Sequence, residues 1–201
     1  MLYFVRHAHT GWNEEGRIQG SQDTELSLLG QKQAQRFADE LNERVKAGLR
    51  IDAIYSSPQK RALQTAEVLA ERLDLVLQVW PGLEEMTYGK WEGKRWVEVE
   101  ELYPEEVQLL LDETRFVSPH GGESYQEMLE RTLSAVAAAS KRHGKGEKLL
   151  FVTHGAVLMA FRSMLSVGHL AQVTDYKLDN VELWPMSKAE FERLYSLVFS
   201  L

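Results

Sequence analysis

The side chains best suited to chemistry share one property: each follows soon after a short apolar run of the sequence. They are Arg6, His7, Arg61, Glu84, Glu85 and His154. Arginine and histidine N–H groups suit phosphate oxygens, and a histidine among cations tends to stay neutral and nucleophilic. A carboxylic acid can protonate a leaving oxygen and later activate water. These residue types together are sufficient for phosphoryl transfer through a phosphohistidine without a metal.

The elements that must position these side chains can be read from the hydrophobic pattern. Apolar runs predict strands at residues 2–5, 51–55, 76–80 and 148–153. Three- and four-residue spacing predicts helices at residues 27–47, 58–73, 124–143 and 155–165. Strands that alternate with helices predict a mostly parallel sheet, whose ligands lie beyond the carboxyl ends of the strands. We therefore expect the reactive side chains at one edge of one sheet.

The fold class expected from this pattern is α/β, a three-layer sandwich in which helices flank a mostly parallel central sheet. We expect one domain over residues 1–201, with a helical cap inserted between the third and fourth strands at about residues 86–145. Its acidic segment, residues 96–116, is interrupted at Pro104. The tail is ambiguous, because residues 191–199 fit either alternation or a short helix. We favour a hairpin that turns near Ser187 and Lys188, after a strand at residues 181–184.

Composition narrows the class of protein. The 201 residues are 44% hydrophobic, which is enough for one sizeable core, and the formal net charge is −7. A nucleic-acid binder would normally carry a basic stripe, so we expect no nucleic-acid partner. Cysteine is absent, which excludes disulfides, thiolate zinc sites and a cysteine nucleophile. No signal peptide or membrane-spanning run is visible, so we expect a cytoplasmic protein that does not bind a membrane.

A set of motifs in fixed order covers most of the chain and resembles the histidine phosphatase superfamily, in the branch that contains cofactor-dependent phosphoglycerate mutases. The motifs are Arg6-His7-Ala8-His9-Thr10 with Trp12-Asn13, Gln19-Gly20, residues 26–30, Ser56-Ser57-Pro58 with Arg61-Ala62, Gln64-Thr65-Ala66, Leu83-Glu84-Glu85 with Gly89, Trp91-Glu92-Gly93, Gly121-Gly122-Glu123-Ser124 and Val152-Thr153-His154-Gly155. Any one of them is weak, but the ordered set is specific.

The resemblance implies a role for each matching position. His7 would be the phosphorylated nucleophile, and Arg6, Arg61 and His154 would hold the phosphoryl oxygens. Glu85 would be the proton donor. The number of residues between Glu85 and Gly89 matches the spacing of the family's acid better than the number between Glu84 and Gly89 does. The resemblance further implies a set of substrate contacts: Asn13, Gln19, Gly20 and the backbone of Gly155.

The resemblance also bears on the reaction. Trp91-Glu92-Gly93 after Gly89 is similar to the phosphatases of the family, and the longer proline-rich insertion of the mutases is not found here. We therefore expect a metal-independent phosphomonoesterase that acts on a small phosphorylated metabolite and needs no cofactor. The alternatives are a phosphoglycerate mutase, which would use 2,3-bisphosphoglycerate, and an inactive member that binds a phosphorylated ligand or a protein.

Two further expectations concern metals and assembly. His9 forms a His-x-His pair with His7, but no third ligand follows with metal-site spacing. We therefore interpret His9 as a residue at the rim of the site and expect no metal. The sequence leaves a homodimer open.

Overall fold

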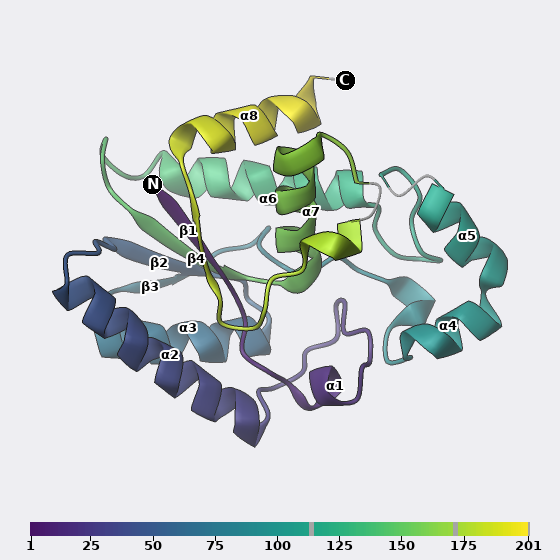
Figure 1. Cartoon of the computed structure of the whole chain (residues 1–201), viewed down its shortest axis with the longest axis horizontal. Helices are drawn as coiled ribbons and strands as arrows, with labels where there is room; N and C mark the ends of the chain where they lie inside the picture. Colours follow the sequence, from purple (N-terminus) through teal and green to yellow (C-terminus); the bar gives the residue numbers. More distant parts are fainter. Residues whose placement is uncertain (113–114, 171–172, 201) are drawn as a thin grey trace.

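The computed structural model describes residues 1–112, 115–170 and 173–200. These residues form a five-stranded sheet in the order β3-β2-β4-β1-β5 (Figure 1). The strands are β1 Leu2–Arg6, β2 Ala53–Ser56, β3 Leu77–Val79, β4 Leu149–Thr153 and β5 Leu183–Met186. β1, β2, β3 and β4 are parallel, and β5 pairs antiparallel with β1 at the edge. The predicted α/β fold with a mostly parallel sheet is confirmed.

Helices cover both faces of the sheet (Figure 1). The helices of the sheet layers are α2 Leu28–Lys46, α3 Lys60–Leu73, α6 Tyr125–Ser140, α7 Gly155–Val167 and α8 Lys188–Phe199. Short elements fill the connections: α1 Gly11–Glu14, η1 Gly89–Trp91, α4 Trp96–Leu102, α5 Pro104–Asp112 and η2 Val173–Tyr176. α2 and α3 lie on one face, and α6, α7 and α8 lie on the other.

The two faces divide the core according to the two-residue period of a strand. Tyr3 and Val5 pack with the apolar residues of α2 and α3, whereas Phe4 packs with those of α6 and α7. Phe4 stacks on Phe151 with ring centroids 5.3 Å apart and meets Phe161 of α7 edge to face at 5.6 Å. Burial of both faces explains why the strands are nearly continuous apolar runs.

The predicted hairpin near Ser187 and Lys188 is wrong, because the chain forms α8 there. The Ser187 hydroxyl accepts a hydrogen bond from the backbone N–H of Glu190, and the Glu190 carboxylate accepts one from the backbone N–H of Ser187. This reciprocal capping starts a helix. Leu194 and Val198, one helical turn apart, are buried against the core.

The segment between β3 and β4 divides into two parts. α4 and α5 lie beyond the end of the sheet (Figure 1). α6 instead packs on the sheet beside α7, through Met128, Leu133 and Val136. A single domain with a cap over residues 86–145 stays a prediction. Within the described residues, no helix is long and apolar enough to cross a membrane.

Candidate active site

Strand register brings the predicted residues together. Arg6, the last residue of β1, lies opposite Thr153 of β4, and the backbone N–H of His7 donates to the Thr153 carbonyl at 3.0 Å. The N–H of Ser57, just after β2, donates to the carbonyl of Val152 at 3.0 Å. His7, Ser57 and His154 therefore follow three adjacent parallel strands at the same edge, as the sequence predicts for the ends of parallel strands.

His7 is held as a neutral imidazole with one free nitrogen. It is 2% exposed, and its Nδ1 lies 2.7 Å from the Ala8 carbonyl oxygen. Because a carbonyl can only accept, the proton sits on Nδ1 and Nε2 keeps its lone pair. Burial, and then the guanidinium groups of Arg61 and Arg6, lowers the pKa of His7 well below its ordinary value. These are the properties of a nucleophile at neutral pH.

The two predicted arginines are fixed by carbonyl oxygens of loops. Arg61, in the first turn of α3, is fully buried and donates to Gln22 at 2.7 Å and to Gly20 at 2.9 Å. Arg6 donates from Nη1 to Leu178 at 3.1 Å. Burial lowers the pKa of Arg61 to about 10, so the group stays charged at neutral pH. The ion pairs that arginine side chains make among the described residues do not include Arg6 or Arg61, so neither charge is neutralised by a direct carboxylate partner.

His154 is fully buried beside His7, with ring centroids 5.3 Å apart. Its Nε2 lies 2.8 Å from the Ser57 hydroxyl. That hydroxyl oxygen already accepts from the N–H of Gln59 at 3.3 Å, so its hydrogen can be donated to His154. Burial, and then Arg61, lowers the pKa of His154 well below its ordinary value. A neutral His154 that accepts at Nε2 carries its proton on Nδ1.

Buried polar atoms without a partner mark the centre of the site. Seven side-chain atoms of the described residues are in this state. Three of them belong to the residues predicted to hold the phosphoryl oxygens, the phosphate clamp: Arg6 Nε, Arg61 Nε and His154 Nδ1. Buried polar groups are nearly always hydrogen-bonded, so each exception needs an explanation. Three N–H donors left open beside a neutral histidine fit an anion with several oxygens.

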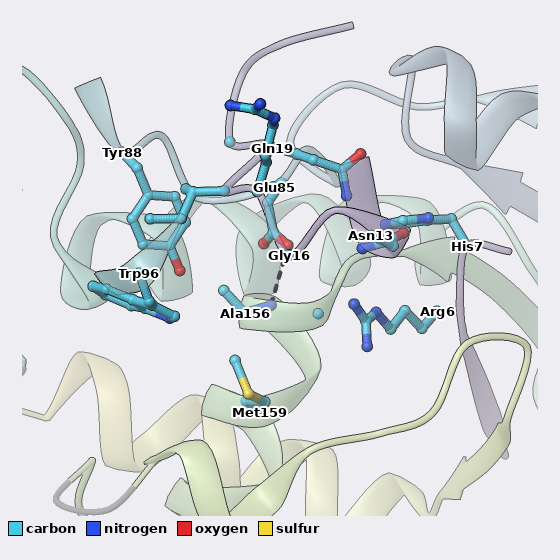
Figure 2. A pocket seen from close by; sticks show the side chains of 14 residues that line it. Arg6, His7, Asn13, Gly16, Gln19, Glu85, Tyr88, Trp96, Ala156 and Met159 are labelled. Atoms are coloured by element: carbon cyan, nitrogen blue, oxygen red, sulfur yellow. Dashed lines mark hydrogen bonds between the residues drawn. The ribbon is translucent and has the colours of Figure 1, made fainter. Parts of the chain in front are cut away.

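Glu85, and not Glu84, faces this cluster. The Glu85 carboxylate lines the pocket and accepts hydrogen bonds from the N–H groups of Ala156, at 3.2 Å, and Met86, at 3.0 Å. Figure 2 shows the contact with Ala156. Glu84 turns back to accept from the N–H of Gly82 at 2.6 Å. The two adjacent carboxylates therefore point in different directions, and the placement of Glu85 fits the role of the acid.

Asn13 and Gln19 both line the pocket. The Asn13 side-chain oxygen accepts from the backbone N–H of Thr10 at 3.1 Å, and the Gln19 side-chain oxygen accepts from the Thr10 hydroxyl at 2.9 Å. Thr10 thus fixes which face of each amide is turned to the pocket. Sequence reasoning gave it no role of its own.

The two other predicted contacts are glycines in tight surroundings. Gly20 has a φ of +52°, and a Cβ there would overlap the Glu92 carboxylate. Its carbonyl is one of the acceptors of Arg61. At Gly155, the first residue of α7, a Cβ would lie 3.2 Å from Arg6 Nε. A side chain at either position would displace a group of the site.

A cavity of about 170 Å³ opens beside this cluster. Seven predicted residues line it: Arg6, His7, Asn13, Gln19, Gly20, Glu85 and Gly155. Arg61 and His154 are fully buried and are not among the residues that line it. The sequence did not indicate a second group of lining residues: Gly16, Arg17, Ile18, Tyr88, Trp96, Ala156 and Met159. Gly16, Arg17, Ile18 and Tyr88 come from loops, and the other three come from α4 and α7.

Comparison with known proteins now defines the class of the protein. The sequence profile of the histidine phosphatase superfamily (branch 1) matches residues 2–192, so the chain belongs to this family. Its predicted membership, and the class of enzyme that it implies, the phosphoric monoester hydrolases, are confirmed.

Particular relatives refine the picture. The chain is similar to a metal-independent phosphoserine phosphatase of Arabidopsis thaliana, with 37% identity over 79% of this chain and 66% of that one. It is similar to phosphoserine phosphatase 1 of Hydrogenobacter thermophilus, with 34% identity over 89% of this chain and 82% of that one. A solved structure of a mycobacterial glucosyl-3-phosphoglycerate phosphatase with VO3 matches at 31% identity, with a TM-score of 0.78, over 90% of this chain and 88% of that one.

Proposed function

We propose that this protein hydrolyses a small phosphorylated metabolite without a metal, through a phosphohistidine at His7. The observation that carries the proposal is the set of unpartnered buried N–H donors, Arg6 Nε, Arg61 Nε and His154 Nδ1, around a neutral imidazole. Within the described residues, no group of three or more histidine, aspartate or glutamate side chains is placed to hold a metal ion. The proposal rests on the donors that are present and on a relative named a metal-independent phosphoserine phosphatase.

In the first step, His7 Nε2 attacks the phosphorus and the bond from phosphorus to the alcohol oxygen breaks. The leaving oxygen takes a proton from Glu85, so that a neutral alcohol departs. Arg6, Arg61 and His154 hold the three remaining oxygens, whose charge spreads over all of them in the transition state. In the second step, water gives a proton to the Glu85 carboxylate and attacks the phosphohistidine, which releases phosphate and restores His7.

The remaining predicted residues bind the substrate. The NH₂ groups of Asn13 and Gln19 and the backbone of Gly155 donate to the phosphate or to the adjacent part of the ester. The absence of side chains at Gly20 and Gly155 leaves Glu92 and Arg6 in place. The cavity, at about 170 Å³, is below the 300–1,000 Å³ usual for drug-sized ligands, which favours a small metabolite. A cytoplasmic location and a homodimer stay predictions from the sequence.

Hydrolysis of 4-nitrophenyl phosphate in EDTA tests this proposal. We expect turnover that EDTA does not affect, and a fall of roughly a thousandfold or more in His7→Ala, because the nucleophile is lost. His169→Ala is a matched control, since His169 is exposed and lies outside the pocket. Activity that returns only with a divalent metal would contradict the mechanism. Interconversion of phosphoglycerates that depends on 2,3-bisphosphoglycerate would establish the mutase instead.

A further inference from the structure

The pocket has a second end whose chemistry differs from that of the phosphate clamp. Tyr88 and Trp96 lie at this end (Figure 2), and Ile18 and Met159 add further apolar surface to the pocket. The Tyr88 hydroxyl is hydrogen-bonded to the side chain of Tyr125, which leaves its ring as the surface offered to a ligand. In Figure 2, Tyr88 and Trp96 lie on the opposite side of Glu85 from His7 and Asn13. An ester whose phosphorus is held at His7 and whose oxygen meets Glu85 therefore directs its alcohol part toward these apolar side chains.

Trp96 is the distinctive residue of this apolar end. It is the first residue of α4 and is 43% exposed, although tryptophan is usually highly buried. Its ring meets the fully buried Trp91 edge to face, with centroids 5.7 Å apart. A large ring that is fixed from behind and open in front provides a rigid surface for a flat apolar group.

Arg17, the charged lining residue outside the phosphate site, is already paired with a carboxylate. The charged residues among those lining the pocket are Arg6, Arg17 and Glu85. Arg6 and Glu85 belong to the phosphate site. Arg17 donates from Nε to the Glu15 carboxylate at 2.6 Å and from Nη1 to the Gly93 carbonyl at 2.6 Å. A carboxylate on the substrate would have to compete with Glu15 for this cation, whereas an apolar group meets no such obstacle.

We propose, building on the function proposed above, that this enzyme prefers phosphate esters of apolar alcohols, aromatic ones above all, over charged esters such as phosphoserine. The alcohol ring packs between Trp96, Tyr88 and Met159. The phosphoserine and glucosyl-3-phosphoglycerate named for its relatives would then be poorer substrates for this chain.

Three alkyl phosphates test this preference with similar leaving groups: 2-phenylethyl phosphate, ethyl phosphate and phosphoserine. We expect kcat/KM to be about tenfold or more higher for 2-phenylethyl phosphate than for ethyl phosphate, as burial of one ring would give. Phosphoserine should be the poorest of the three. Trp96→Ala should reduce the phenyl-to-ethyl ratio to about three or less, as the loss of most of that contact would give.

Leu102→Ala is the matched control, because Leu102 is also exposed on α4 but lies outside the pocket, and it should leave the ratio unchanged. A preference for phosphoserine, or a ratio that Trp96→Ala does not change, would overturn the apolar preference while leaving the phosphatase intact. Failure of all three esters and of 4-nitrophenyl phosphate would contradict the proposed function itself.

A different observation concerns the loop that carries Glu85. Arg131 of α6 donates to three carbonyls of this loop: Gly82 at 3.1 Å, Glu84 at 2.9 Å and Glu85 at 2.9 Å. Its Nε and Nη2 are also bound by both oxygens of Glu123, at 2.7 and 2.8 Å. Both terminal nitrogens of this side chain therefore hold the loop, whereas Nε binds only Glu123, and Arg131 is not among the residues that line the pocket.

We infer that Arg131 is a positioning residue that sets the place of the Glu85 carboxyl. Only the planar guanidinium group of arginine can donate to the three carbonyls and the carboxylate together, so lysine cannot replace Arg131. A small displacement of an acid affects proton transfer to the leaving oxygen more than it affects binding of the phosphate.

Leaving groups of different basicity test this role. In Arg131→Lys we expect kcat to fall about tenfold for ethyl phosphate but less than about threefold for 4-nitrophenyl phosphate, whose leaving group needs little protonation. When Glu85 is already changed to Gln, adding Arg131→Lys should have no further effect on that difference. An equal fall for both substrates, or effects of the two substitutions that multiply, would show that Arg131 only stabilises the fold.

Discussion

The two ends of the pocket are built from different parts of the chain. The phosphate end comes from residues at or soon after the ends of parallel strands, with His7 2% exposed and Arg61 fully buried. The apolar end comes from the segment after β3, from α4 and from Met159, and Trp96 is 43% exposed there. The sheet fixes the first end, whereas the second can change without altering the sheet. We therefore expect the reaction to be set at one end and the choice of substrate at the other.

Substitution of Arg61, at the phosphate end, should have the largest effect on kcat/KM. Arg61→Met removes charge and donors from the phosphate that all substrates share, so kcat/KM should fall about a hundred- to a thousandfold. The fall should be the same for ethyl phosphate and 2-phenylethyl phosphate, as steady-state kinetics can show. Arg61→Lys, which keeps the positive charge, is the control. Thermal unfolding of both variants would show whether a loss of activity comes from misfolding. A fall that depends on the alcohol would break the division between the ends.

A charge introduced at the apolar end should have a smaller effect, and it should change the preference among esters instead of the rate with all of them. Trp96→Lys places a cation where the alcohol part lies, so phosphoserine should gain relative to 2-phenylethyl phosphate by about tenfold or more. The rate with ethyl phosphate should change much less than this ratio. Competition assays with both esters in one reaction measure the ratio directly. If all three esters lose activity equally, Trp96 serves the reaction and not the choice of substrate.

The pH dependence should show the smallest effect, and it concerns the phosphate end alone. Neutral His7 is the reactive form, and its pKa lies well below the ordinary 6.5. We therefore expect kcat/KM to fall with decreasing pH only when the pH is well below 6.5. Arg6→Met removes one of the charges that lower the pKa of His7, so the acid limb should move to higher pH. Trp96→Ala should not move it. A profile that is the same in Arg6→Met and the unchanged protein would contradict this origin of the shift.

The same pKa has a consequence for stability. Unfolded His7 takes up a proton near pH 6.5, but folded His7 does so only at lower pH. The unfolded state therefore binds more protons between these two values, and the free energy of unfolding should fall as the pH drops below 6.5. Denaturant titrations at pH 7.5 and 5.5 would measure it, and an equal fall in His7→Ala would assign the effect to other groups.

Much of the phosphate end could be predicted from the sequence, because the ends of parallel strands must meet. Arg6, His7 and His154 follow apolar runs that only a buried strand explains, and register then places them together. The apolar end gave no such signal, since Tyr88 and Trp96 lie in a segment without strand period. From the sequence, Trp96 would be interpreted as a packing residue. Only the three-dimensional structure shows that it lines the pocket.

The tail shows how an ambiguous period misleads. Phe191, Tyr195 and Phe199 recur every four residues, but the short segment also fits alternation. The decisive signal was Ser187 followed three residues later by Glu190, which is the pattern of a capping box. Cap chemistry specifies the start of α8 where hydrophobicity does not. Similarly, α3 begins at Lys60 and not at Pro58, although Arg61 still falls in its first turn.

Isolation of the phosphorylated enzyme tests the central claim most directly. The protein is mixed with a ³²P-labelled phosphate ester in EDTA, quenched within one turnover and examined for bound label. The structure predicts label that is stable to base, lost in acid and located on His7, and it predicts none in His7→Ala. Label that survives in His7→Ala, or that resists acid, would contradict the assignment of His7 as the nucleophile.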